Sequence, residues 1–191
     1  LSKKTYSKLL ADNKEPYVTF LAGGSGSGKT SAVKNIPEVT NVMQKSAVIL
    51  DSNLSSYSSA VKKIDEAKKA GKVVTVEYVY RDPVDSLING VVKRMIQNPD
   101  EGGRLVPTKV VASNHIDSWD VAKQLQDDGY GVSFIDNSLG AGNAKIVGRD
   151  VLESKIKYPS VEELTDMFNK EIKKLYDNGT INKEQYDGYI R

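Results

Sequence analysis

The sequence YVTFLAGGSGSGKT, residues 17–30, joins an apolar run to a glycine-rich run. Residues 17–22 are rich in β-branched and aromatic side chains and stop at a pair of glycines, which predicts a buried strand. Residues 23–30 then fill every fixed position of the pattern G-x-x-x-x-G-K-[ST], and a helix is expected to begin at about Lys29. A strand, loop and helix in this order predict a phosphate-binding loop.

This loop has the chemistry that a bound triphosphate requires. Small residues let backbone N–H groups approach phosphate oxygens closely, and the N-terminus of the next helix attracts an anion. Lys29 supplies a mobile positive charge for the β- and γ-phosphates, and the Thr30 hydroxyl can ligate Mg²⁺. We therefore predict that ATP and Mg²⁺ bind here. The predicted nucleotide-binding residues are Gly23, Gly24, Ser25, Gly26, Ser27, Gly28, Lys29 and Thr30.

The rest of the chain alternates predicted strands with predicted helices. Further strands are expected at residues 47–50, 72–80, 132–135 and 144–147. Helices are expected from about residue 29 to a stop at Pro37, and over about 56–70, 83–98, 108–128 and 160–177, with a short one from about 182. Alternation of this kind predicts an α/β fold, a three-layer sandwich of the P-loop NTPase type with a mainly parallel sheet, plus C-terminal helices. We expect one P-loop domain over residues 1–155 and a helical appendage, residues 156–191, packed on the same domain.

Composition narrows the possible functions. The 191 residues carry 27 Lys and Arg against 25 Asp and Glu, so the net charge is +2, and broad binding to nucleic acid is not expected. The absence of Cys and the single His exclude disulfides, thiol catalysis and multi-His metal sites. No apolar run reaches the ~18 residues of a membrane helix, and no signal peptide is visible, which predicts a cytoplasmic protein. Because the chain begins with Leu1, we expect a piece of a longer protein.

Two apolar strands end in aspartate, which a phosphate-transfer site needs beside its loop. We predict that Asp51 orients or deprotonates the phosphate acceptor. Asp136 is followed by Asn137 and Ser138, so ordinary turn chemistry explains it.

Cations must also cover the transferring phosphate. Arg94, near the end of a predicted helix, and Arg104, after two glycines, are expected to close over it; the alternative is two solvated surface arginines. His115 is interpreted as a polar helix residue rather than a catalyst, and Trp119 as a core residue or a pocket wall.

Taken together, these segments resemble the zeta-toxin-like P-loop kinases over about residues 15–150. The resemblance is carried by the phosphate loop, VILD at 48–51, GKVV at 71–74, YRDP at 80–83 and GRLVP at 103–107, with His115 beyond. It implies a kinase that transfers the ATP γ-phosphate to a hydroxyl of a small molecule, with a UDP-activated amino sugar as one acceptor. It also implies an antitoxin partner, or neighbouring domains of a larger phage or mobile-element protein. The residues implied in catalysis are Lys29, Asp51, Arg94 and Arg104.

One departure from the family concerns the catalytic base. The toxins carry the base on one strand and an acidic substrate contact on a later strand. Here only residues 35–46 separate the first helix from the next strand. Either the base strand is missing, or Asp51 does both jobs, or the base position is Asn53, which cannot take a proton.

Two other functions stay open at this stage. The chain is either such a kinase or a nucleotide-binding module of a larger protein with weak or no catalysis, which the shortened base region favours. The third possibility, a kinase for a nucleic-acid end, is disfavoured by the near-neutral charge and the few arginines.

Overall fold

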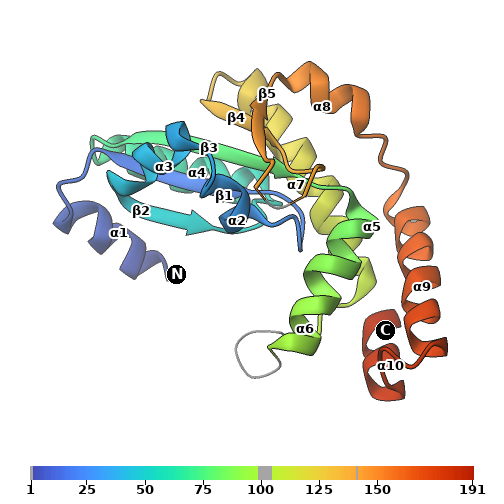
Figure 1. Cartoon of the computed structure of the whole chain (residues 1–191). Helices are drawn as coiled ribbons and strands as arrows, with labels where there is room; N and C mark the ends of the chain where they lie inside the picture. The colour runs from blue at the N-terminus through green and yellow to red at the C-terminus, as the bar shows by residue number, and fades with distance from the viewer. Residues whose placement is uncertain (1, 99–104, 141) are drawn as a thin grey trace.

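The computed structural model describes residues 2–98, 105–140 and 142–191. A single five-stranded sheet with strand order β2-β1-β3-β4-β5 forms the centre of its larger part (Figure 1). Strands β1 to β4 run parallel to one another, and β5 runs antiparallel to β4. All five predicted strands are confirmed. Their bounds are β1 Tyr17–Ala22, β2 Ser46–Asp51, β3 Val73–Tyr80, β4 Val132–Asp136 and β5 Lys145–Val147.

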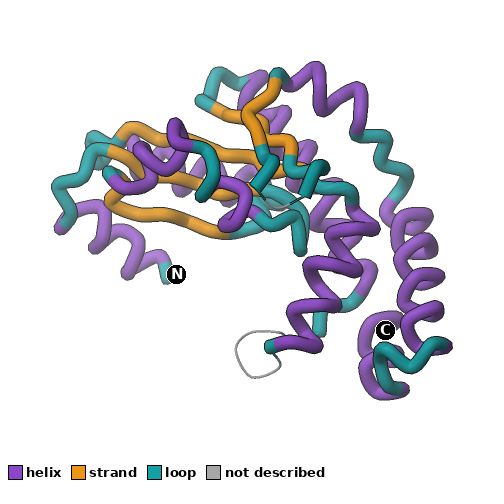
Figure 2. Tube along the Cα trace, in the orientation of Figure 1, coloured by secondary structure: helices purple, strands orange, loops and turns teal. Residues whose placement is uncertain are grey.

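Helices cover both faces of the sheet, which confirms the predicted three-layer α/β sandwich (Figure 2). On one face, α2 (Lys29–Val33) and α3 (Pro37–Gln44) bury Val33 and Val39 against Leu21, Val79 and Ile135 of the sheet. On the other face, α4 (Tyr57–Lys69) and α7 (Thr108–Asp127) pack on Phe20 and Tyr78. The first helix, α1 (Lys3–Asp12), and α8 (Arg149–Lys155) add to that second face.

A second core lies beyond the end of the sheet, around the N-terminal half of α7 (Figure 1). It contains α9 (Val161–Asp177), which begins at a capping box formed by Ser160 and Glu163, and α10 (Lys183–Ile190). These helices pack against the segment formed by α5 (Pro83–Asp85), the π-helix η1 (Ser86–Val92) and α6 (Lys93–Gln97). No helix among the described residues combines the length and apolar character that crossing a membrane requires.

Three local details differ from the sequence prediction. The helix expected from about Lys29 stops before Pro37, as predicted, but Pro37 itself begins a further helix, α3, at the first helical position, where a missing N–H costs nothing. The helix expected at 83–98 contains the π-helical turn η1, which periodicity does not reveal. Helix α8 was not predicted, because its seven residues are too few for a clear apolar period.

Candidate functional site

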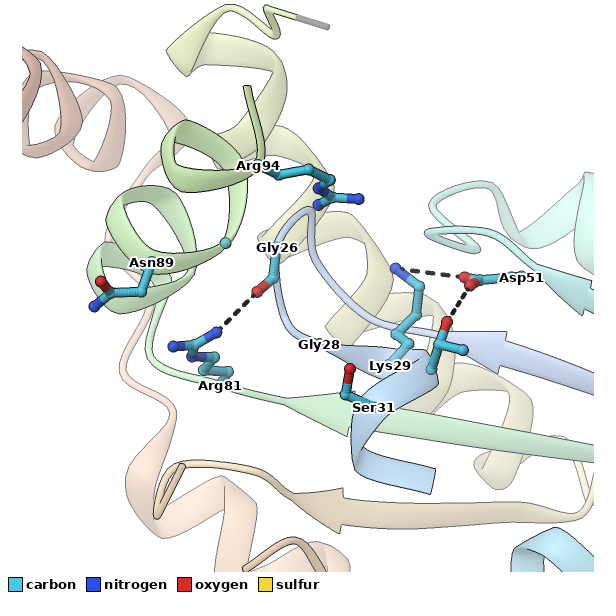
Figure 3. A pocket seen from close by; sticks show the side chains of 10 residues that line it. Gly26, Gly28, Lys29, Ser31, Asp51, Arg81, Asn89 and Arg94 are labelled. Carbon is cyan, nitrogen blue, oxygen red and sulfur yellow. Dashed lines mark hydrogen bonds and ion pairs between the residues drawn. The ribbon is translucent and has the colours of Figure 1, made fainter. Parts of the chain in front are cut away.

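A pocket of about 400 Å³ opens where β1, β2 and β3 end, beside the phosphate loop (Figure 3). This is the edge of a parallel sheet at which α/β proteins bind ligands. The pocket brings together the predicted loop glycines Gly26 and Gly28 with four predicted functional side chains, those of Lys29, Thr30, Asp51 and Arg94. Arg104, the other predicted cation, lies outside the described residues. The lining residues are Gly26, Gly28, Lys29, Thr30, Ser31, Asp51, Arg81, Asn89, Gly90 and Arg94.

Three glycines of the loop, Gly23, Gly26 and Gly28, have conformations that other residues adopt only at a cost. Gly28 caps α2 with a φ of 76°, in the left-handed region. Gly23 has a φ of 138°, and a Cβ there would lie 2.4 Å from the carbonyl oxygen of Val79. The loop therefore lies directly against β3, so the glycines of the motif are required by packing as well as by phosphate approach.

Lys29 is a nearly buried cation without a close anionic partner among the described residues. Its side chain is 12% exposed, and its Nζ lies 3.8 Å from Asp51 Oδ1. Its two hydrogen bonds, to Gly23 O and Asn53 Oδ1, are both 3.4 Å long. Burial lowers the pKa of Lys29, Asp51 opposes that effect, and the charge of Arg94 adds to it. A bound phosphate would satisfy this ammonium group better than its present neighbours do.

Thr30 and Asp51 place two oxygen atoms side by side. The Thr30 hydroxyl donates a 2.8 Å hydrogen bond to Asp51 Oδ2, and the Asp51 side chain is 47% exposed. Within the described residues there is no group of three or more His, Cys, Asp or Glu side chains that would hold a metal alone. A hydroxyl and one carboxylate fit Mg²⁺, which takes its other ligands from phosphates and water. These two side chains are therefore a suitable protein contribution to a Mg²⁺ site.

Side chains from distant segments of the chain form hydrogen bonds to the phosphate loop. His115 is 1% exposed, and its Nε2 lies 3.0 Å from the Ser25 carbonyl oxygen, so the neutral ring donates there. Asn114 Nδ2 donates to Ser25 Oγ at 3.1 Å, and Asn137 Nδ2 donates to Ser27 O at 2.9 Å. Burial lowers the pKa of His115 to about 4. His115 is a polar residue of helix α7, as interpreted from the sequence, and the structure adds that it is a buried support of the phosphate loop.

Trp119 and Asp136 have structural surroundings. Trp119 is buried against Tyr78 and Phe134, which confirms its interpretation as a core residue. Asp136 accepts from the backbone N–H and hydroxyl of Ser138 in a turn, and it forms an ion pair with Lys155. Asp136 does not line the pocket beside the phosphate loop.

Arg81 and Asn89 line the pocket but were not among the predicted site residues, although Arg81 belongs to the YRDP segment that carries the family resemblance. Arg81 directly follows β3, which pairs with the strand that precedes the loop. Because ligands bind at the carboxyl ends of parallel strands, its position directly after β3 is the sequence feature that could have identified Arg81. Both residues also line an adjoining pocket of about 530 Å³, which shares Gly28 and Arg94 and continues to Asn137 and Gly140 beyond β4.

The fold and the site together define a P-loop protein. A family model for the zeta toxin matches residues 2–52 and 41–135, which is more than half of the chain. The chain therefore belongs to the zeta toxin family, a family of the P-loop kinase type. The strand that ends in Asp51 lies within both matched ranges.

Solved structures with low sequence identity have the same fold. A chain of the native AvrRxo1-ORF1:-ORF2 complex superposes with a TM-score of 0.59 at 16% identity, covering 96% of this chain and 77% of that one. A chain of the same complex with ATP has a TM-score of 0.55 at 14% identity, with coverages of 82% and 71%. A chain of the PezAT chromosomal toxin–antitoxin system of Streptococcus pneumoniae has a TM-score of 0.51 at 12% identity, with coverages of 92% and 98%. No curated protein sequence matches the chain.

Proposed function

We propose that this protein binds ATP with Mg²⁺ beside the phosphate loop and transfers the γ-phosphate to a hydroxyl group of a small molecule. The observation that carries the proposal is the convergence of Lys29, Thr30, Asp51 and Arg94 on one pocket at the carboxyl edge of the sheet. Membership of the zeta toxin family supports the reaction class, and the related AvrRxo1 complex with ATP supports the nucleotide.

Each converging residue has a role that phosphoryl transfer requires. The loop amides and Lys29 hold the β- and γ-phosphates, and Arg94 supplies positive charge where negative charge spreads in the transition state. The Thr30 hydroxyl and Asp51 hold Mg²⁺, which neutralises phosphate charge when it is bound. We assign Arg104 to the same pocket on sequence grounds alone, as a second cation over the transferring group.

The position of Asp51 favours metal binding over proton abstraction. One carboxylate oxygen of Asp51 accepts a hydrogen bond from Thr30, and the other faces the Lys29 ammonium group. Neither oxygen is therefore free to take a proton from the hydroxyl that accepts the phosphate. The side chain that contacts Lys29 from the next loop is Asn53, which is no base. Because phosphoryl transfer depends chiefly on positioning and electrostatics, transfer does not require a dedicated base.

The same observation supports an alternative, a nucleotide-binding module with weak or no transfer. Among the described strands, β2 is the outermost on its side of the sheet and pairs only with β1. This side of the sheet therefore has one strand that ends in an acidic residue, whereas the toxins have two, one with the catalytic base and one with the substrate contact. The two functions differ in turnover and not in ATP affinity.

The acceptor and the partner complete the proposal. We infer that the acceptor is a small molecule with a free hydroxyl, and a UDP-activated amino sugar is the first to test because of the family. A protein that blocks the pocket, as an antitoxin, or neighbouring domains of a longer chain are the proposed partners. The likeness to a chain of the PezAT toxin–antitoxin system supports the first of these.

The decisive experiment is mass spectrometry of a metabolite extract incubated with the protein, ATP and Mg²⁺. Gain of one phosphate on one metabolite, with ADP formed, establishes the kinase. A parallel incubation with UDP-N-acetylglucosamine alone tests that acceptor. Tight ATP binding with no phosphorylated product and no ADP would instead establish the binding module.

A further inference from the structure

Arg81 lines the pocket beside the phosphate loop, and an ion pair with Asp85 holds its side chain. Arg81 follows the last residue of β3, next to the strand that leads into the phosphate loop. Its side chain is only 18% exposed and lines both adjoining pockets. Figure 3 shows the guanidinium group directed at Gly26, across the pocket from Lys29. The distance from its Nη1 to the Gly26 carbonyl oxygen is 3.4 Å.

The Asp85 carboxylate binds the Arg81 guanidinium group through its Nε. Arg81 Nε donates to Asp85 Oδ2, and the second oxygen of Asp85 accepts from Asn89 Nδ2 at 2.6 Å. Burial alone would raise the pKa of Asp85, but the hydrogen bonds from Arg81 and Asn89 lower it, so the carboxylate is charged at neutral pH. Asp85 therefore restricts the rotation of the arginine side chain and leaves its terminal nitrogens toward the pocket.

The donors of Arg81 are only partly used. A guanidinium group has five N–H donors, and among the described residues one engages Asp85 and one makes the long contact to Gly26 O. The charges of the side chains that line the pocket also favour an anionic ligand. Three cations, Lys29, Arg81 and Arg94, line the pocket with one carboxylate, Asp51. The Asp85 carboxylate behind Arg81 offsets a second positive charge, and the sum stays positive. This excess of positive charge suits a polyphosphate, and an arginine fork can grip two phosphate oxygens.

We propose that Arg81 is a third cation that binds the nucleotide triphosphate, and that Asp85 is the positioning residue that sets its orientation. The inference rests on the proposed function, because it concerns the same nucleotide. The inference adds to the nucleotide site an arginine that directly follows a strand. Arg81 is therefore already oriented before the nucleotide binds. The gain is that little side-chain entropy is lost on binding.

Calorimetric titration with β,γ-imido-ATP and Mg²⁺ at several salt concentrations tests this role. We expect Arg81→Gln to weaken binding about 10- to 100-fold, the usual effect of losing charge-assisted hydrogen bonds. The salt dependence of the affinity should also become shallower, because one cation no longer faces the phosphates. Arg81→Lys keeps the charge, so it should retain the salt dependence and recover part of the affinity.

Two further variants separate contact from positioning. Asp85→Asn leaves the Arg81 charge in the pocket but loosens it, so it should cost less affinity than Arg81→Gln, about 2- to 5-fold, with the salt dependence unchanged. Arg149→Gln is the matched control, because Arg149 is also paired with carboxylates, Asp127 and Glu153, but lies outside the pocket. It should bind as the wild type does.

The outcomes distinguish this inference from the proposed function. If the wild type does not bind the analogue, or if Lys29→Ala binds it unchanged, the proposed function fails. If the wild type binds and Lys29→Ala does not, but Arg81→Gln keeps full affinity, the role of Arg81 alone is overturned. Equal losses in Arg81→Gln and Arg81→Lys with an unchanged salt dependence would also overturn it, since Arg81 would then only shape the loop. Should Arg81→Gln fail to fold, Arg81→Lys and Asp85→Asn decide the matter, because wild-type affinity in both would overturn the role of Arg81.

Discussion

At the level of single residues, the phosphate loop depends on side chains that its motif does not contain. His115, Asn114 and Asn137 bond to the loop from positions more than eighty residues away in the sequence. The motif itself predicts the loop, Lys29 and Thr30, because local backbone chemistry is the same in every such loop. The supports could not be predicted, since only the folded chain shows which helix lies beneath the loop.

Lys29 is expected to be essential for nucleotide binding. Lys29→Ala removes the mobile charge for the β- and γ-phosphates but leaves the loop amides. We expect the rise in melting temperature produced by ATP and Mg²⁺ to disappear, because a ligand that binds only the native state stabilises it in proportion to its affinity. The matched control is Lys34→Ala, an exposed lysine at the end of the same helix, which should shift as the wild type does. An unchanged shift in Lys29→Ala would place the phosphates elsewhere.

The burial of His115 predicts a loss of stability in acid. Its pKa is about 4 in the folded chain against 6.5 when exposed. Between these values the unfolded chain binds more protons, so stability falls as the pH drops from about 6.5 to about 4. A shift of this size corresponds to about 3 kcal/mol. His115→Gln has no such titration, so urea unfolding at pH 7, 5.5 and 4.5 should show a shallower pH dependence. Parallel curves for the two proteins would exclude this role.

The Asp51 carboxylate predicts a specific effect of magnesium. Asp51→Asn keeps the size of the side chain but removes its charge beside Thr30. We expect the gain in ATP affinity on adding Mg²⁺ to fall about tenfold, as for other weakened metal sites. Phosphate transfer should fall by at least about 10². If transfer falls that far while the effect of Mg²⁺ on affinity is unchanged, Asp51 acts as the base instead.

At the level of elements, a contact between two glycines joins the phosphate loop to the π-helix η1. A Cβ on Gly26 would lie 2.2 Å from the Ser86 carbonyl oxygen, and a Cβ on Gly90 would lie 2.5 Å from the Gly26 carbonyl oxygen. Because η1 continues into α6, this contact fixes where Arg94 enters the pocket. Alternation and apolar period predicted the order of strands and helices, but neither reports a π-turn or a backbone contact between distant segments.

Gly90→Ala tests that contact. The added methyl group meets backbone atoms, which cannot move aside as a flexible side chain can, so the loop or η1 must shift. We expect ATP affinity to fall at least about tenfold, with a loss of stability of about 1–3 kcal/mol. Gly131→Ala is the matched control, because its Cβ would meet only the Val74 carbonyl oxygen, at 3.8 Å. Equal ATP affinity in both variants would show that the glycine contact is not needed for binding.

At the level of the whole molecule, α7 connects two cores. Its first half contributes Val111 and Ala112 to the core that holds α9 and α10, and its second half contributes Trp119 and Leu125 to the core under the sheet. The sequence predicted both C-terminal helices. The sequence could not predict which segment packs on their apolar faces. An amphipathic pattern indicates that one face of a helix is buried, but it does not identify the segment that covers it. The shared helix implies that residues 156–191 unfold together with the rest.

Phe168→Ala tests whether the molecule is one cooperative unit. Phe168 is fully buried on α9 in the core that α7 shares, so its truncation should cost about 3–5 kcal/mol of unfolding free energy. For a chain of this size each kcal/mol lowers the melting temperature by roughly 2–4 °C. The neighbouring residue gives the control, because Met167 on the same helix is 45% exposed and Met167→Ala should change little. With α7 in both cores, Phe168→Ala should lower one single transition, followed alike by calorimetry, by circular dichroism and by the fluorescence of Trp119 in the other core. Two transitions, of which only the lower one moves while the Trp119 signal keeps its wild-type midpoint, would instead make residues 156–191 an independent domain.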